Sequence, residues 1–189
     1  MQKAIVKGSL TDIQQTSGKS LAETFLNSEI VVLVDTSASM GNNDAPGSIS
    51  RYQAACGQLE TIQGDSPGKV AVISFSSWPA FCPNGTPDNL NGGTNMVDAL
   101  KFVKPVDGTD TKIVLVSDGE PDDYFSGGAD TLAVARTFQT PIDVIYIGPE
   151  GGRGYQFLQQ LAKLTGGKSF KSEAPGLLGE GIETLLLIG

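Results

Sequence analysis

The sequence predicts an α/β fold with a doubly wound, mainly parallel central sheet and helices on both faces. Continuous apolar runs occupy residues 30–34 and 113–116, the pattern of strands that are covered on both sides. Segments with helical spacing of apolar residues separate these runs. Such alternation indicates right-handed crossovers between parallel strands.

The first half of the chain contains three of the predicted strands. Thr11 and Ser50 are candidate N-caps for two helices. Pro79 and Pro83 flank a short segment that is tolerated only at a sheet edge, so we expect an antiparallel edge strand there. The expected elements are an extended segment over 2–10, helices over 11–25 and 51–62, strands over 30–34 and 69–75, and the edge strand over 80–82.

The second half repeats the alternation of helix and strand. Gly92 and Gly93 open a helix, and Gly166 follows another helix, where glycine relieves the left-handed cap. The leucine-rich end of the chain has helical spacing. The expected elements are helices over 94–103, 129–138, 155–164 and 177–187, and strands over 113–116, 142–147 and 169–171.

A chain of 189 residues fits one domain with a substantial core. We expect residues 1–28 to form an N-terminal extension whose short helix packs on the domain, and residues 29–189 to form the domain itself. The start of the sequence lacks the apolar core of a signal peptide. No apolar stretch approaches the ~20 residues of a transmembrane helix. We therefore expect a cytoplasmic protein without a membrane partner.

Charge excludes several functions. The net charge of −8 and the absence of a Lys/Arg cluster argue against a nucleic-acid partner. The chain has no histidine, which excludes a zinc or iron site built on imidazole. Cys56 and Cys82 do not have a metal-binding spacing, and the sequence leaves open whether they form a disulfide.

Oxygen-bearing side chains follow the predicted buried strands. Asp35, Ser37 and Ser39 come directly after residues 30–34, Asp118 follows 113–116, and Thr94 stands at the start of a helix. Ligands of open parallel sheets bind at the carboxyl ends of the strands. If the two strands are neighbours, Asp35 and Asp118 emerge side by side.

This donor set suits a hard divalent cation such as Mg²⁺, which prefers oxygen ligands in near-octahedral geometry. Hydroxyl groups are neutral, so a cation held by three of them keeps much of its charge. A vacant coordination position then attracts an external carboxylate. This chemistry favours a docking site over a catalytic one.

The segments Asp35-Thr36-Ser37-Ala38-Ser39, Gly93-Thr94 and Ser117-Asp118-Gly119 together resemble the metal-ion-dependent adhesion site of von Willebrand factor type A domains. The order and the strand and helix context match over nearly the whole chain. The resemblance implies the Rossmann-like fold of that family. It also implies a protein-binding module and no enzyme.

The resemblance further implies a role for each site residue. Ser37, Ser39 and Thr94 would touch the metal directly or through water, and Asp35 and Asp118 would act through water or as acceptors behind the ligands. The cofactor is expected to be Mg²⁺ or Mn²⁺, with Ca²⁺ a poorer candidate. A partner protein would supply an Asp or Glu as the sixth ligand. Compact acidic members of the family often serve inside multiprotein assemblies.

The same residues are compatible with other functions. A metal-dependent phosphohydrolase could use Asp35 as its nucleophile, although phosphatases of the haloacid-dehalogenase type want a second aspartate where Ser37 stands. The site could also be vestigial. Thr94 could cap the following helix as well as bind metal. Asp122 and Asp123 with Glu120 are interpreted as a solvated acidic turn rather than a second cation site.

Overall fold

The computed structural model describes residues 4–45, 47–89, 91–148 and 153–171. Six strands form one sheet in the order β3-β2-β1-β4-β5-β6, in which only the β2–β3 pair is antiparallel. The strands are β1 (Ile30–Asp35), β2 (Val70–Phe75), β3 (Pro79–Phe81), β4 (Lys112–Ser117), β5 (Ile142–Tyr146) and β6 (Ser169–Lys171). The predicted α/β class, parallel sheet and antiparallel edge strand are confirmed.

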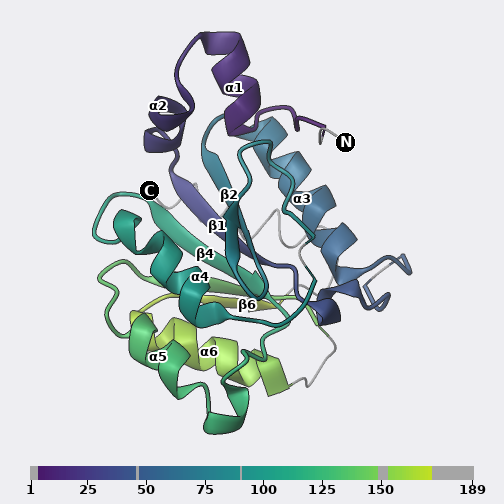
Figure 1. Cartoon of the computed structure of the whole chain (residues 1–189), viewed down its shortest axis with the longest axis vertical. Helices are drawn as coiled ribbons and strands as arrows, with labels where there is room; N and C mark the ends of the chain where they lie inside the picture. The colour runs from purple at the N-terminus through teal and green to yellow at the C-terminus, as the bar shows by residue number, and fades with distance from the viewer. Residues whose placement is uncertain (1–3, 46, 90, 149–152, 172–189) are drawn as a thin grey trace.

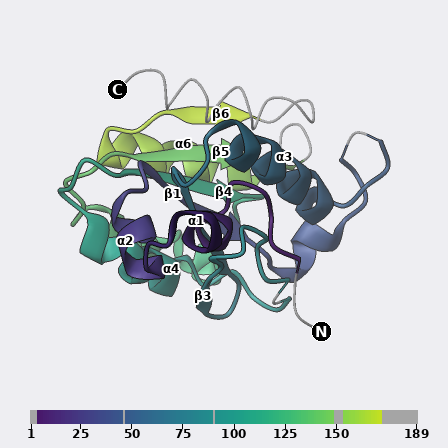
Figure 2. The ribbon, with the colours of Figure 1, turned by 90° about the horizontal axis from the view of Figure 1, so that it is seen from above.

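The helices lie on both faces of this sheet. They are α1 (Leu10–Ser17), α2 (Leu21–Leu26), α3 (Arg51–Asp65), α4 (Met96–Val103), α5 (Ala129–Ala135) and α6 (Arg153–Thr165). Figure 1 shows α1 and α2 together at one end of the molecule and α5 and α6 at the other. Figure 2 shows α3 and α4 separated by the strands.

Alternate residues of β1 enter two separate cores. Val31 and Leu33 pack with apolar residues of α4 and α6. Val32 and Val34 pack with Leu59 and other residues of α3. Every residue of β1 is buried, as expected for a strand covered on both faces.

The N-terminal region differs from its prediction. A single helix was expected over residues 11–25, but two helices form. The Ser9 side chain caps α1, and Gly18 ends it in the left-handed conformation at φ 72°. Ser20 and Glu23 form a capping box that starts α2. Local capping therefore divides a segment whose apolar spacing indicated one helix.

Other boundaries shift by a few residues. The edge strand starts at Pro79, where proline needs no ladder hydrogen bond. The α4 helix begins at Met96 with Asn95 as its cap, and α5 ends at Ala135. Cys56 is half-buried and is not joined to Cys82 by a disulfide, a point that the sequence left open. The helix expected over 177–187 lies outside the described residues.

Candidate metal centre

Asp35 is the last residue of β1, and its side chain is fully buried. The Ser37 amide donates a 2.8 Å hydrogen bond to Asp35 Oδ1. The Ser117 hydroxyl donates a 2.6 Å hydrogen bond to Asp35 Oδ2. Burial, followed by the negative charge of Asp118, raises the pKa of Asp35 to about 7. The carboxyl group is therefore held between β1 and β4 in a position where a nearby cation would favour its charged form.

Ser37 and Ser39 follow Asp35 at the same edge of the sheet. Their hydroxyl oxygens lie 3.2 Å apart. Ser37 precedes a 3₁₀ helix, Ala38–Gly41, which turns the chain toward α3. The Ala38 amide donates a 3.0 Å hydrogen bond to the Gly92 carbonyl. This bond attaches the turn that carries Ser37 and Ser39, the serine turn, to the loop that leads to Thr94.

Thr94 lies two residues before α4 and does not cap it, because the Asn95 side chain accepts from the Asp98 amide. The Thr94 amide donates a 2.7 Å hydrogen bond to Asp122 Oδ1. The Asp122 amide donates in return to the Thr94 carbonyl at 3.0 Å. The backbone of Thr94 is thus fixed to the loop after β4.

Asp118 follows β4, and its side chain is 7% exposed. Its Oδ2 atom lies 2.7 Å from Nη1 of Arg51, the first residue of α3. The same guanidinium group contacts Asp44 through Nε at 2.8 Å and Nη2 at 2.5 Å. Hydrogen bonds from Arg51 to Asp44, and then to Asp118, raise the pKa of the guanidinium group. Arg51 therefore stays charged at the edge of the candidate site.

The predicted residues do not all face one hollow. Ser39 and Asp118 line a hollow of about 270 Å³ together with Arg51. Thr94 lines a different hollow of about 280 Å³ with Asp122. Ser37 is joined to Ser39 by their hydroxyl contact, and Asp35 lies behind them. The loop that carries Thr94 is attached to the turn of Ser37 and Ser39 by the Ala38–Gly92 hydrogen bond. Thr94 nevertheless lines a different hollow from Ser39 and Asp118.

The donor set is chemically suited to a hard cation, since it consists of two carboxylates and three hydroxyls. Burial and then the negative charge of Asp118 raise the pKa of Asp35, so a cation near Asp35 would favour its charged form. Within the described ranges, no three His, Cys, Asp or Glu side chains gather as a metal-binding group. A metal held here would depend on the serine and threonine hydroxyls.

Sequence reasoning missed Arg51 and the structural contacts that Asp122 and Asp123 make. The carboxylate of Asp123 accepts from the amides of Asp130 and Thr131 and from the Thr131 hydroxyl. Glu120 and Asp122 of the acidic turn are exposed, as expected, and Asp123 in addition serves as a structural acceptor. An aspartate shortly before a helix start is a signal that could have suggested capping. No local pattern marks Arg51 as the partner of Asp118.

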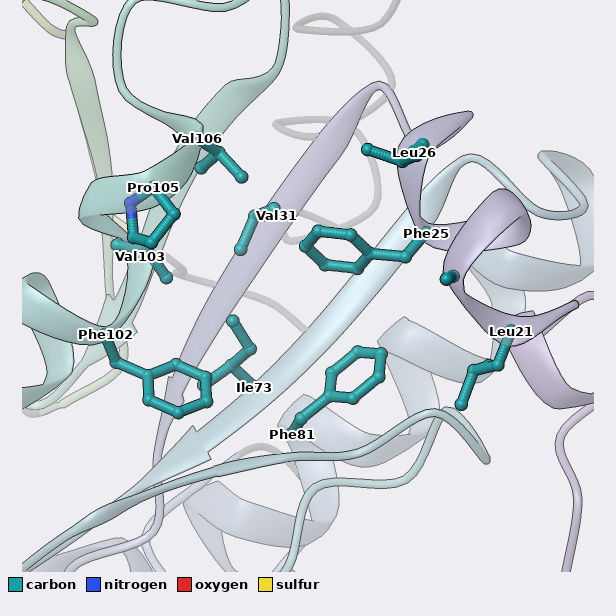
Figure 3. Close-up of a pocket in the computed structure, with 11 residues that line it drawn as sticks. Leu21, Phe25, Leu26, Val31, Ile73, Phe81, Phe102, Val103, Pro105 and Val106 are labelled. Atoms are coloured by element: carbon teal, nitrogen blue, oxygen red, sulfur yellow. The ribbon is translucent and has the colours of Figure 1, made fainter.

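A separate apolar pocket lies away from the candidate site. Its volume is about 570 Å³, and α2, β3 and α4 contribute Phe25, Phe81 and Phe102 to its wall. Figure 3 shows the three rings around the opening, with Val31 and Ile73 of the sheet between them. Phe25 and Phe81 meet edge to face, with ring centroids 5.5 Å apart. The pocket carries no group that could take part in metal binding.

None of the helices in the described ranges has the length and apolar character that a membrane crossing requires. No family model matches the sequence. No curated protein matches it either.

Solved structures do resemble it. A von Willebrand factor type A protein from Catenulispora acidiphila has a TM-score of 0.64 and 17% identity, covering 84% of this chain and 42% of that chain. An aerotolerance-related membrane protein from Bacteroides fragilis, with multiple mutations to serine, has a TM-score of 0.62 and 19% identity, covering 83% and 97%. The VWA domain of SpRpn10 has a TM-score of 0.60 and 14% identity, covering 83% and 94%.

At these identities the likeness concerns the fold alone. The strand order and the single antiparallel edge strand agree with it. The chain has the fold of von Willebrand factor type A domains.

Proposed function

We propose that this chain is a protein-interaction module that binds Mg²⁺ or Mn²⁺ and captures a carboxylate of a partner protein. The observation that carries the proposal is the grouping of Asp35, Ser37, Ser39 and Asp118 where β1 and β4 end. Ser37 and Ser39 have their hydroxyl oxygens 3.2 Å apart, close enough to share one cation. Asp35 and Asp118 supply the negative charge that such a cation needs.

Each residue has a distinct role in this proposal. The hydroxyls of Ser37, Ser39 and Thr94 hold the cation. The Thr94 side chain turns toward it on a backbone that stays fixed to Asp122. Asp35 and Asp118 stand behind them and orient metal-bound water. Because the hydroxyls are neutral, the cation keeps enough charge to bind an Asp or Glu side chain from outside. In this proposal, the bound cation would only provide a coordination position for the carboxylate of the partner.

The phosphohydrolase alternative has less support. A nucleophilic carboxylate must reach its substrate, but Asp35 is fully buried. Both of its oxygens already accept hydrogen bonds, from the Ser37 amide and the Ser117 hydroxyl. This geometry is better suited to orienting neighbouring groups than to attacking a phosphorus atom.

The first test is calorimetric titration of the metal-stripped protein with Mn²⁺ and Mg²⁺. We expect saturable binding that is lost in the Ser37→Ala, Ser39→Ala double variant. The control is Ser17→Ala, which removes an exposed hydroxyl on α1 that donates to the Ile13 carbonyl. Equal binding by the wild type and the double variant would contradict the proposed ligands.

The second test concerns the vacant coordination position. Mn²⁺-loaded protein is titrated with acetate while the relaxation of water protons is followed. A carboxylate that replaces a metal-bound water lowers the relaxation enhancement. An enhancement that is unchanged at saturating acetate would contradict carboxylate capture, even if the metal itself binds.

A further inference from the structure

The guanidinium group of Arg51 is an internal cation beside the candidate metal centre. Arg51 is 7% exposed although it carries a full charge. Asp118, one of its two carboxylate partners, is equally shielded, whereas the side chain of Asp44, the other partner, is 45% exposed. Charge pairs shielded from water interact more strongly than exposed ones. The contact with Asp118 is therefore the more consequential of the two.

A divalent cation at Ser37 and Ser39 would meet this positive charge in the same hollow, since Ser39, Arg51 and Asp118 line it together. The incoming cation and Arg51 would both draw on the carboxylate of Asp118. Two like charges in one hollow repel each other, and the shielded surroundings weaken solvent screening. This repulsion would reduce the affinity for the cation.

We infer that Arg51 is a built-in competitor for Asp118 that sets the cation affinity of the site, and that Asp44 adjusts the strength of this competition. The inference rests on the proposed metal-binding function. Asp44 takes two of the three guanidinium contacts, through Nε and Nη2. Its negative charge partly neutralises the guanidinium group and thereby weakens the attraction between Arg51 and Asp118.

This arrangement gives two substitutions effects of opposite sign. Arg51→Gln removes the competing charge, so we expect the dissociation constant for Mn²⁺ to fall by about tenfold or more. Asp44→Asn leaves Asp118 as the charged partner of Arg51, so we expect the dissociation constant to rise by a few fold. In the double variant, the Asp44→Asn change should have no further effect, because its target is gone.

Arg153→Gln is the matched control. Arg153 lines the same hollow, but its side chain is 76% exposed and its nearest described carboxylate partner is Glu120 at 3.6 Å. The same charge is removed without disturbing Asp118, so the affinity should change less than in Arg51→Gln. Calorimetry measures all four variants, and circular dichroism checks that each one is folded. If Arg51→Gln fails to fold, Asp44→Asn still tests the inference, because the side chain of Asp44 is exposed.

The outcomes separate the two ideas. If the wild type binds Mn²⁺ but Arg51→Gln binds no tighter and Asp44→Asn no weaker, the role of Arg51 is wrong and the proposed function stands. If neither the wild type nor any folded variant binds Mn²⁺, the proposed metal site and this inference both fail. Binding that is absent in the wild type but present in Arg51→Gln would support the competition directly.

Discussion

The hydroxyl of Ser117 donates a 2.6 Å hydrogen bond to Asp35 Oδ2, joining the ends of β4 and β1 inside the sheet. Both residues are fully buried. Because Val34 pairs with Val116, the next residue on each strand is placed for this contact. The bond fixes the orientation of a carboxyl group that burial would otherwise leave poorly satisfied.

Ser117→Ala is therefore expected to destabilise the fold by about 1–3 kcal/mol, because a buried acceptor loses its donor. Urea unfolding followed by circular dichroism measures the change. Ser126→Ala removes an exposed hydroxyl that donates to the Asp123 carbonyl, and it should alter stability by about 0.5 kcal/mol or less. Equal effects of the two substitutions would show that the Ser117 contact adds nothing to stability.

The fold could be predicted because its strongest signals are short apolar runs in the sequence. These runs determine which strands are buried on both faces of the sheet. The apolar runs of β1 and β4 require cover on both faces, whatever lies next to them. The division of the N-terminal helix depended on Gly18 and on the capping box of Ser20 and Glu23. These residues are visible in the sequence, but the prediction of a single helix relied on the spacing of apolar residues alone.

The candidate site could be predicted only in part. The strand ends indicated that Asp35 and Asp118 would be neighbours, and Asp118 indeed influences the pKa of Asp35. Arg51 could not be assigned, because its partner Asp118 is 67 positions away and nothing local links the two. Arginine at a helix start is ordinarily solvated. Only the packing of α3 against the end of the sheet brings it to the carboxylate.

Gly8 and Gly18 provide a test of how closely the N-terminal segment packs on the domain. Both have positive φ, 81° and 72°. A Cβ at Gly8 would lie 1.8 Å from the Gln63 carbonyl oxygen, whereas one at Gly18 would meet nothing within 4 Å. Gly18→Ala should cost about 1 kcal/mol from backbone strain alone. Gly8→Ala should cost at least about 2 kcal/mol more, because backbone must move.

Urea unfolding of both glycine variants measures this difference. The Gly68 amide also donates to the Gly8 carbonyl at 2.8 Å, so displacement of Gly8 should disturb the turn before β2. Similar losses in the two variants would show that residues around Gly8 do not pack on α3 in solution.

Asp107 should make stability depend on pH. Its side chain is 5% exposed. Burial opposes its charged form, but hydrogen bonds from Lys104 and from the Thr140 and Gln139 amides prevail and lower the pKa of Asp107 below its usual value. A lowered pKa in the folded state means that the unfolded state binds more protons as the pH falls. The stabilisation is therefore complete above the unfolded pKa of about 4. It is lost as the pH falls through the folded value.

Comparison with Asp107→Asn isolates this contribution. The difference in unfolding free energy between wild type and variant should be constant from about pH 5 to 7 and should shrink below about pH 4. Chemical denaturation at a series of pH values measures it. A difference that does not change over the whole range would mean that the Asp107 carboxylate is equally stabilised in both states.

Asp122 should control metal binding without being a ligand itself. Its carboxylate accepts from the Thr94 amide at 2.7 Å, and a Cβ at Gly93 would lie 2.7 Å from the same oxygen. The loop that carries Thr94 is thus packed tightly against this one side chain. If Thr94 completes the proposed site, Asp122→Ala releases it and should weaken Mn²⁺ binding by about tenfold, the usual lower limit for the loss of a supporting contact.

Asp123→Ala is the matched control for this prediction. Asp123 is the next residue, and its carboxylate holds the first turn of α5 through the Asp130 and Thr131 amides. Its loss should lower stability but leave the Thr94 loop in place, so Mn²⁺ affinity at a temperature where the variant is folded should be close to that of the wild type. Calorimetry distinguishes the two substitutions. If both weaken binding equally, the effect comes from general loosening of the acidic turn, and Thr94 has no special place in the site.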